Sequence, residues 1–200
     1  MGLRSPLARL AAGAPVPLFP VIGAGARRSV EALRIRPELE LVDSPRWAEV
    51  VLFTGHLTAE LFPAALLLHD QAPRPRLAAW WPLGAPDEGL GAAIPGLVVI
   101  RSEEDLARTV AQAHPDLLSG RKPSSPPALL DVEPAPWRGV GPYGQGGKGM
   151  TGGLPYGRPL AGRGPDRDGL ALDRLPARVG PAFPPFPPGL VLEVTLQGDV

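Results

Sequence analysis

The chain has 200 residues, and its 20 basic and 20 acidic side chains give a formal net charge of zero. This balance does not favour nucleic acid or an anionic membrane surface as a partner, because both attract a basic face. The absence of cysteine excludes disulfides, thiolate nucleophiles, cysteine-bound zinc and all-cysteine iron–sulfur clusters. The three histidines lack ligand spacing, so we expect no metal and no cofactor. No apolar run is long enough to cross a bilayer, and we expect a cytoplasmic protein.

Glycine and proline divide the chain into parts of different character. They account for 23 of the first 120 residues but for 30 of the last 80. Such a composition weakens helices and sheets and leaves few side chains for a core. We therefore predict an N-terminal arm over residues 1–14, an α/β domain over 15–120 and a largely irregular extension over 121–200. The sequence R-K-P-S-S-P-P after Gly120 is typical of a linker.

The first half of the domain alternates short strands and helices. Residues 16–22 form an apolar run whose prolines make it a poor central strand. A helical turn or two is expected over 29–35, and a short strand over 39–42. Residues 50–54 are continuously apolar, which indicates a strand buried on both faces. Thr58 is expected to cap the next helix, whose apolar residues recur at helical spacing.

The second half continues this alternation. Strands are expected at residues 77–81 and 97–100, and Ser102 is expected to cap a helix that ends at Pro115. Strands that alternate with helices imply right-handed crossovers and a parallel sheet. The predicted fold class is thus α/β: a small three-layer domain with about four parallel strands, followed by a Gly/Pro-rich extension.

Two glycine-rich stretches invite a nucleotide-binding interpretation. The first, G-A-G-A-R-R from Gly23 to Arg28, follows an apolar run, but Arg28 replaces the third glycine of the dinucleotide fingerprint. The second, G-Q-G-G-K-G-M-T from Gly144 to Thr151, lacks a hydroxyl residue directly after its lysine. We favour glycine turns without a ligand at both places, with a stand-alone nucleotide-binding protein as the weaker alternative.

The stretch I-G-A-G-A-R-R-S-V-E-A-L from Ile22 to Leu33 resembles the small electron-transfer subunit shared by respiratory complex I (NADH:quinone oxidoreductase) and group-4 membrane-bound [NiFe] hydrogenases. In that family a similar stretch carries two cysteines that bind a four-iron cluster. Gly25 and Arg28 stand at those two positions here, and Glu31 stands at the family's glutamate. The resemblance implies a degenerate iron–sulfur site, because Arg28 brings a cation where a thiolate is required.

The most specific similarity runs from Leu41 to Thr58, which resembles the family pattern S-P-R-x-A-D-x-L-x-V-x-G-x-x-T. Gly84 then falls on the position of the third cysteine. The fourth position corresponds either to residues 95–97 or to residues 101–103, and neither contains cysteine. The resemblance covers about residues 15–115 and implies that all four cluster ligands are lost.

The C-terminus from Gly180 is similar to the opening of the partner large subunit. Residues 190–197 alternate in polarity, which predicts an edge strand. In quinone-binding members of that family a histidine of this loop approaches the quinone, and Phe183 replaces it here.

The resemblance leads us to expect a non-catalytic structural or assembly subunit of a complex-I-like or hydrogenase-like complex. Its partners would be a large-subunit-like chain and membrane subunits, and it would be peripheral on the inner face of the membrane. The alternative is a redox-complex subunit that contributes to a quinone-facing surface without its own cluster. The residues expected to face partners are Arg46, Trp80, Trp81, Tyr143, Arg167 and Phe183, although packing in the core or at its rim is the favoured interpretation for the tryptophan pair.

Overall fold

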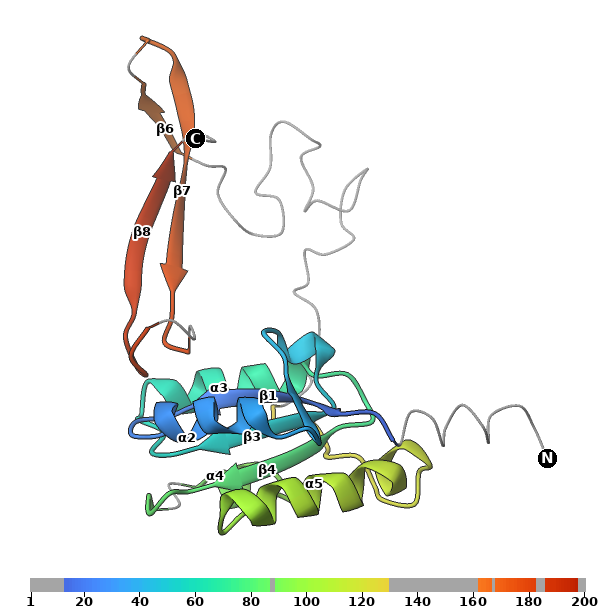
Figure 1. The fold of residues 1–200 in the computed structure, drawn as a ribbon. Coiled ribbons are helices and arrows are strands. Elements are labelled where there is room, and N and C mark those ends of the chain that lie inside the picture. Colours follow the sequence, from blue (N-terminus) through green and yellow to red (C-terminus); the bar gives the residue numbers. More distant parts are fainter. Residues whose placement is uncertain (1–12, 87–88, 130–161, 167, 183–185, 198–200) are drawn as a thin grey trace, which may run out of the picture. The chain divides into compact units, whose positions relative to one another are not determined.

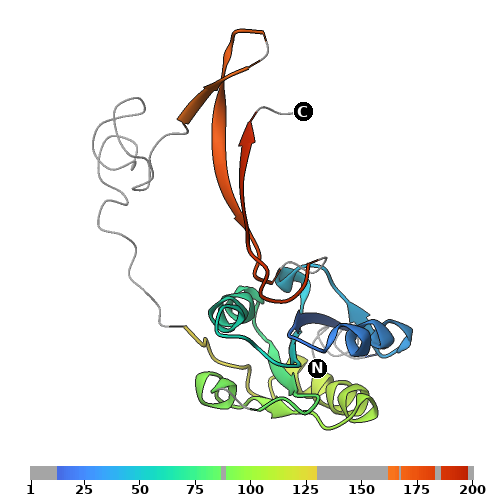
Figure 2. The same cartoon turned by 90° about the vertical axis from the view of Figure 1, so that its left-hand side faces the viewer.

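The computed structural model describes residues 13–86, 89–129, 162–166, 168–182 and 186–197. The chain divides into two compact units. Unit 1 contains residues 1–129 and 180–190, and unit 2 contains residues 130–179 and 191–200. Figures 1 and 2 show the elements of each unit from two directions.

Unit 1 is built on a five-stranded parallel sheet in the order β2-β1-β3-β4-β5. The strands are β1 (Val16–Ile22), β2 (Leu39–Leu41), β3 (Val50–Thr54), β4 (Leu77–Trp81) and β5 (Val98–Val99). The helical elements between them are α2 (Arg27–Ala32), η1 (Leu33–Ile35), η2 (Pro45–Trp47), α3 (Leu61–Gln71), α4 (Leu90–Ala93) and α5 (Glu103–Leu118). The predicted α/β class is confirmed, and the sheet has five strands where about four were expected.

Helices cover both faces of this sheet, which explains the uninterrupted apolar runs of its central strands. One core packs α3 and α4 against the sheet, and the other packs α5 and η1 against the opposite face. All five residues of β3 and all five of β4 are buried. Because successive side chains point to opposite faces, Trp80 enters the first core and Trp81 the second.

The expectation that residues 16–22 would make a poor central strand is wrong, because β1 lies between β2 and β3. The backbone groups of Val16 and Leu18 bond to the β2 side, and those of Pro17 and Gly23 bond to the β3 side. The nitrogen of Pro17 therefore faces β3, but at a level where β3 has not yet begun. The nitrogen of Pro20 faces β2, but at a level where β2 has already ended. Neither proline removes a donor that the sheet uses.

The last helix of unit 1 also differs from the prediction. Ser102 caps it as expected, since its Oγ accepts the N–H of Asp105 at 3.1 Å. Pro115 does not end the helix, which continues to Leu118. A proline at this point leaves unpaired the carbonyl four residues earlier, and that carbonyl belongs to the exposed residue Ala111, where water can reach it.

Unit 2 contains a three-stranded antiparallel sheet in the order β6-β7-β8 (Figure 1). Its strands are β6 (Gly162–Pro165), β7 (Ala171–Val179) and β8 (Leu192–Gln197). The edge strand expected near the C-terminus is present as β8. The description of the extension as largely irregular missed β6, whose sequence G-R-G-P resembles a loop, and β7, which contains a proline and charged residues that are uncommon in strands.

Candidate functional site

The carboxyl ends of β1 and β3 are the first place to look for a ligand. In this doubly wound strand order the chain goes from β1 outward to β2 and then back across to β3, so the order reverses between β1 and β3. Ligands of such folds bind in the crevice outside the carboxyl ends at this switch point. The loops that reach the crevice begin at Gly23 and at Gly55.

Backbone hydrogen bonds join these two loops directly. The N–H of Gly23 donates to the carbonyl of Thr54 at 2.8 Å, and Ala24 and His56 exchange hydrogen bonds of 2.8 and 3.2 Å in an antiparallel bridge. A Cβ atom on Gly23 would lie 2.4 Å from the His56 carbonyl oxygen, and one on Gly55 would lie 2.6 Å from that of Ala24. These glycines allow the two backbones to touch, and their contact spans the crevice where a dinucleotide would lie.

The positions that the motif resemblance aligns with cluster ligands lie at this same edge of the sheet. Gly25 and Arg28 follow β1, and Gly84 follows β4 in a turn closed by the hydrogen bond from Ala85 N to Pro82 O. Of the two candidate segments for the fourth position, only residues 101–103 follow the carboxyl end of β5, since residues 95–97 precede that strand. Topology thus brings segments about 60 residues apart to one edge.

The side chains at these positions do not fit an iron–sulfur cluster. Gly25 and Gly84 have no ligating atom, and both adopt positive φ angles, of 80° and 87°. Arg28 is an exposed cation, and the hydroxyl of Ser102 is used as a helix cap. Within the described ranges no group of three or more His, Asp or Glu side chains could hold a metal ion.

A small apolar pocket lies at the carboxyl ends of β3 and β4. Its lining residues are Gly55, Leu57, Phe62, Trp80, Pro86 and Leu90. The space inside is about 10 Å³, which holds at most one water molecule. This pocket itself is therefore too small for a cofactor.

The residues expected to face partners differ in their exposure. Trp80 and Trp81 are only 8% and 6% exposed, so they are core residues and offer almost no surface to a partner. Arg46 is exposed on η2. Its neighbour Trp47 is 76% exposed, and sequence reasoning overlooked it. Tyr143, Arg167 and Phe183 lie outside the described residues, as does the second glycine-rich stretch.

A buried polar cluster between α3 and β4 is the largest feature that the sequence did not indicate. The Asp70 carboxylate lies 2.8 Å from both His69 Nδ1 and Arg76 Nη2. It also accepts the backbone N–H groups of Ala128 and Leu129 at 2.9 and 2.8 Å. The only sequence signal was the sequence H-D followed by an arginine six residues later, a pattern too common to be specific.

This cluster holds residues 124–129 against the domain. The backbone N–H groups of Arg76 and Ala78 donate to the hydroxyls of Ser124 and Ser125, both at 3.0 Å. Ser125 N in turn donates to the carbonyl of Arg76 at 2.8 Å. The segment interpreted as a linker therefore begins as part of unit 1, which extends to Leu129.

Burial and hydrogen bonding shift the pKa values of the cluster. Burial lowers the pKa of His69, because the interior disfavours its imidazolium. Burial also lowers the pKa of the Arg76 guanidinium. For Asp70, burial by itself would raise the pKa, but the N–H donors of Ala128 and Leu129, the hydrogen bond to His69 and the charge of Arg76 together lower the pKa. His69 has no exposed side-chain surface and Asp70 is 19% exposed, so the imidazole is out of reach of a substrate and its contact with Asp70 is part of the fold.

A second buried histidine, His114 on α5, is hydrogen-bonded through Nε2 to the Glu49 carboxylate just before β3. The His114 side chain is 3% exposed. The pair joins α5 to the sheet at the amino ends of the strands, away from the switch point. Glu49 itself is 31% exposed, and His114 lines a space of about 240 Å³ beside Pro37 and Glu38.

The sequence matches no protein-family model, and a search of curated proteins finds no match. None of the helices in the described part of the chain combines the length and the apolar character needed to cross a membrane.

Proposed function

We propose that this chain is a non-catalytic structural subunit of a complex-I-like or hydrogenase-like membrane oxidoreductase. It would dock on a large-subunit-like chain and on membrane subunits at the inner face of the membrane. The strand order and the location of Gly25, Arg28 and Gly84 at one edge of the sheet support a relationship to a cluster-binding domain. The absence of thiolates from the whole sequence supports a role without electron transfer.

The observation that carries the assembly role is the amphipathic sheet of unit 2. On one face of β7 and β8 every cross-strand pair is apolar: Leu175 with Leu196, Ala177 with Val194, and Val179 with Leu192. On the other face Arg174 pairs with Gln197, Pro176 with Thr195, and Arg178 with Glu193. We call the first set the apolar row.

The apolar row is largely exposed in unit 2. Leu175 and Leu196 are 58% and 53% exposed, and Leu192 is 38% exposed. Small antiparallel sheets need a covered hydrophobic face to be stable, and exposed apolar patches of this kind mark interaction surfaces. A sheet with one polar and one apolar face is suited to lie on a partner protein with its apolar row inward.

Affinity purification of the full chain from detergent-solubilised membranes tests the proposal. We expect mass spectrometry to identify a large-subunit-like chain and antiporter-like membrane subunits. The double substitution Leu175→Lys with Leu196→Lys should remove them. The matched control, Pro176→Lys with Thr195→Lys, changes the adjacent pair on the polar face and should retain them. Recovery of the chain alone, or equal recovery of these partners with both double variants, would contradict the assembly role.

A further inference from the structure

The outer edge of β2 carries a second unpartnered feature, independent of the apolar row. In the five-stranded sheet β2 pairs only with β1. The backbone bonds from Val16 N to Glu38 O and from Val42 N to Leu18 O show that even-numbered residues of this segment face β1. By alternation the carbonyl of Leu39 and the N–H of Leu41 point outward. The described part of the chain supplies neither group with a hydrogen-bond partner.

A groove lined by both apolar and charged residues, with Arg34, Arg36 and Glu40 among them, runs beside this edge. It has a volume of about 420 Å³ and lies between η1 and β2, with Ile35, Pro37, Leu39 and Leu41 among its lining residues. Ile35 is 83% exposed, which is unusual for an isoleucine next to a sheet edge. A strand added to β2 would place every second side chain over this groove.

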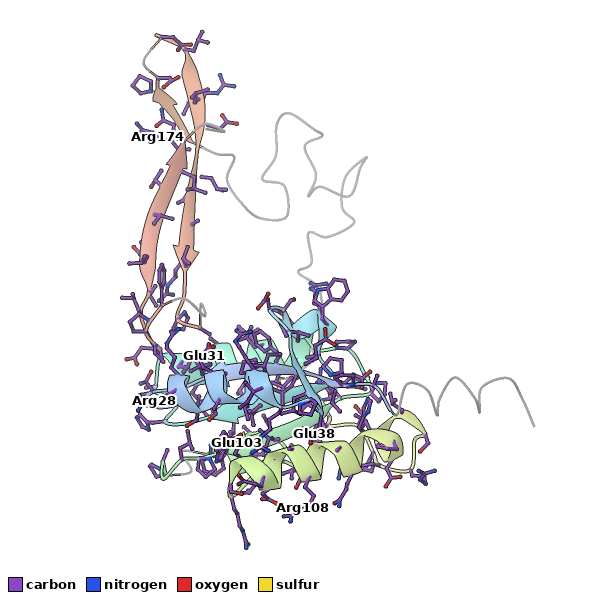
Figure 3. All side chains as sticks on the ribbon, in the orientation of Figure 1. Arg28, Glu31, Glu38, Glu103, Arg108 and Arg174 are labelled. Atoms are coloured by element: carbon purple, nitrogen blue, oxygen red, sulfur yellow. The ribbon has the colours of Figure 1, made fainter. Side chains whose placement is uncertain are left out.

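The charges around the edge are not balanced. Both arginines of the groove are paired within unit 1: Arg34 lies 2.8 Å from Glu31, and Arg36 lies 2.6 Å from Glu103. Glu38 and Glu40 are exposed, and neither forms a salt bridge within the described residues. Figure 3 labels Glu31, Glu38 and Glu103 around this region. Glu38, directly before β2, and Glu40, at the rim of the groove, therefore make this edge acidic.

We propose that the β2 edge binds an extended segment of a different protein, in which basic and apolar side chains alternate. The segment would donate an N–H to the Leu39 carbonyl and accept the N–H of Leu41, as in strand addition to a sheet edge. Its basic side chains would lie opposite Glu38 and Glu40, and its apolar side chains would cover Ile35 and Leu41.

The same charges argue against a second copy of this chain as the occupant. Two β2 edges paired with each other would bring Glu40 close to its own equivalent, and like charges opposite each other destabilise a strand pair. The short length of β2 and its glutamates are also devices that discourage edge-to-edge association. A basic partner strand converts that repulsion into attraction.

The test uses the full chain and short synthetic peptides. An alternating Lys-Val peptide is compared with a peptide of the same composition in which the lysines and valines form separate blocks, and with an alternating Glu-Val peptide. We expect only the alternating Lys-Val peptide to bind, with weaker binding at higher salt. Binding should slow hydrogen exchange at the Leu41 amide.

Charge reversal at the edge makes the test specific. Glu40→Lys should weaken binding of the Lys-Val peptide by about tenfold and allow the Glu-Val peptide to bind. Glu60→Lys, at an exposed glutamate before α3, is the control and should change neither affinity. Circular dichroism verifies that both variants are folded, and Glu40→Gln provides an intermediate case.

Two results would overturn the proposal. One is equal binding of the alternating and block peptides, which would show a non-specific charge effect. The other is self-association of the chain through β2, seen as a concentration-dependent mass in sedimentation equilibrium that Glu40→Lys alters. Failure of the peptide experiment leaves the apolar row untouched, so it is distinguishable from failure of the assembly role.

Discussion

The Asp70 carboxylate lies 2.8 Å from Nη2 of Arg76, although the Arg76 side chain is only 3% exposed. A buried guanidinium requires such a partner, because the desolvation of an unpaired charge is costly. The same carboxylate accepts two backbone N–H groups from residues 128 and 129. One side chain thus neutralises a buried cation and also attaches the end of unit 1 to its core.

Replacement of Asp70 by asparagine should destabilise unit 1. The substitution leaves the Arg76 cation without its counter-ion, and we expect the free energy of unfolding to fall by about 2 kcal/mol, since Asp70 retains some exposure. Urea denaturation measures the change. Hydrogen exchange should also accelerate at Leu129. Asp43→Asn, at an exposed aspartate, is the control, and equal stability of the two variants would contradict the role of Asp70.

Acidification should reduce stability in two stages. The pKa of His69 is lowered in the folded protein, so the unfolded chain takes up the proton first and stability falls as the pH drops below about 6.5. The pKa of Asp70 is also lowered, so its contribution persists above its unfolded value of 3.8 and is lost as the pH falls below that value.

The first stage can be assigned with His69→Gln. Urea midpoints measured across the pH range should lose their dependence on pH just below 6.5 in this variant. A variant that is less stable at every pH but keeps the wild-type slope would assign the stage to another group.

The bridge between the β1 and β3 loops predicts that a glycine with an ordinary φ is more costly to replace than one with a positive φ. Gly25→Ala places a side chain at a φ of 80° with no atom near its Cβ, and should cost about 1 kcal/mol. Gly23→Ala drives a Cβ against the His56 backbone and should cost about 2–3 kcal/mol despite its ordinary φ. Thermal or urea unfolding measures the stability of both variants. A larger loss of stability in Gly25→Ala than in Gly23→Ala would mean that the loops are not in contact.

Ser102 should contribute to the stability of α5 through its cap. Loss of the hydroxyl in Ser102→Ala removes the acceptor for the Asp105 N–H and should cost about 1 kcal/mol. Ser119→Ala, at the other end of the helix, removes only an exposed hydrogen bond to the Asp116 carbonyl and serves as the control. Equal losses in both variants would argue against a specific cap.

Local patterns predicted the elements of unit 1 well, because the period of hydrophobicity reports burial directly. The unbroken apolar residues of β3 and β4 indicated strands covered on both faces, and helices do cover both. The alternation in β8 likewise indicated an edge strand, and β8 is one. The predictions made from the prolines of β1 and α5 were wrong. The cost of a proline in a strand or helix depends on whether a neighbouring backbone group needs the N–H that it lacks, and the sequence does not show where that is.

The absence of iron–sulfur chemistry was determined by the sequence alone, since a chain without cysteine has no thiolate to offer in any fold. Only the tertiary structure could show which distant parts of the chain meet. It brings Gly25, Arg28 and Gly84 to one edge of the sheet, joins Gly23 to His56 across the crevice, and attaches residues 128–129 to Asp70. In each case one partner lies more than 30 positions along the chain from the other, as Gly84 does from Gly25 and Arg28, and the periodicity of a sequence reports only on near neighbours.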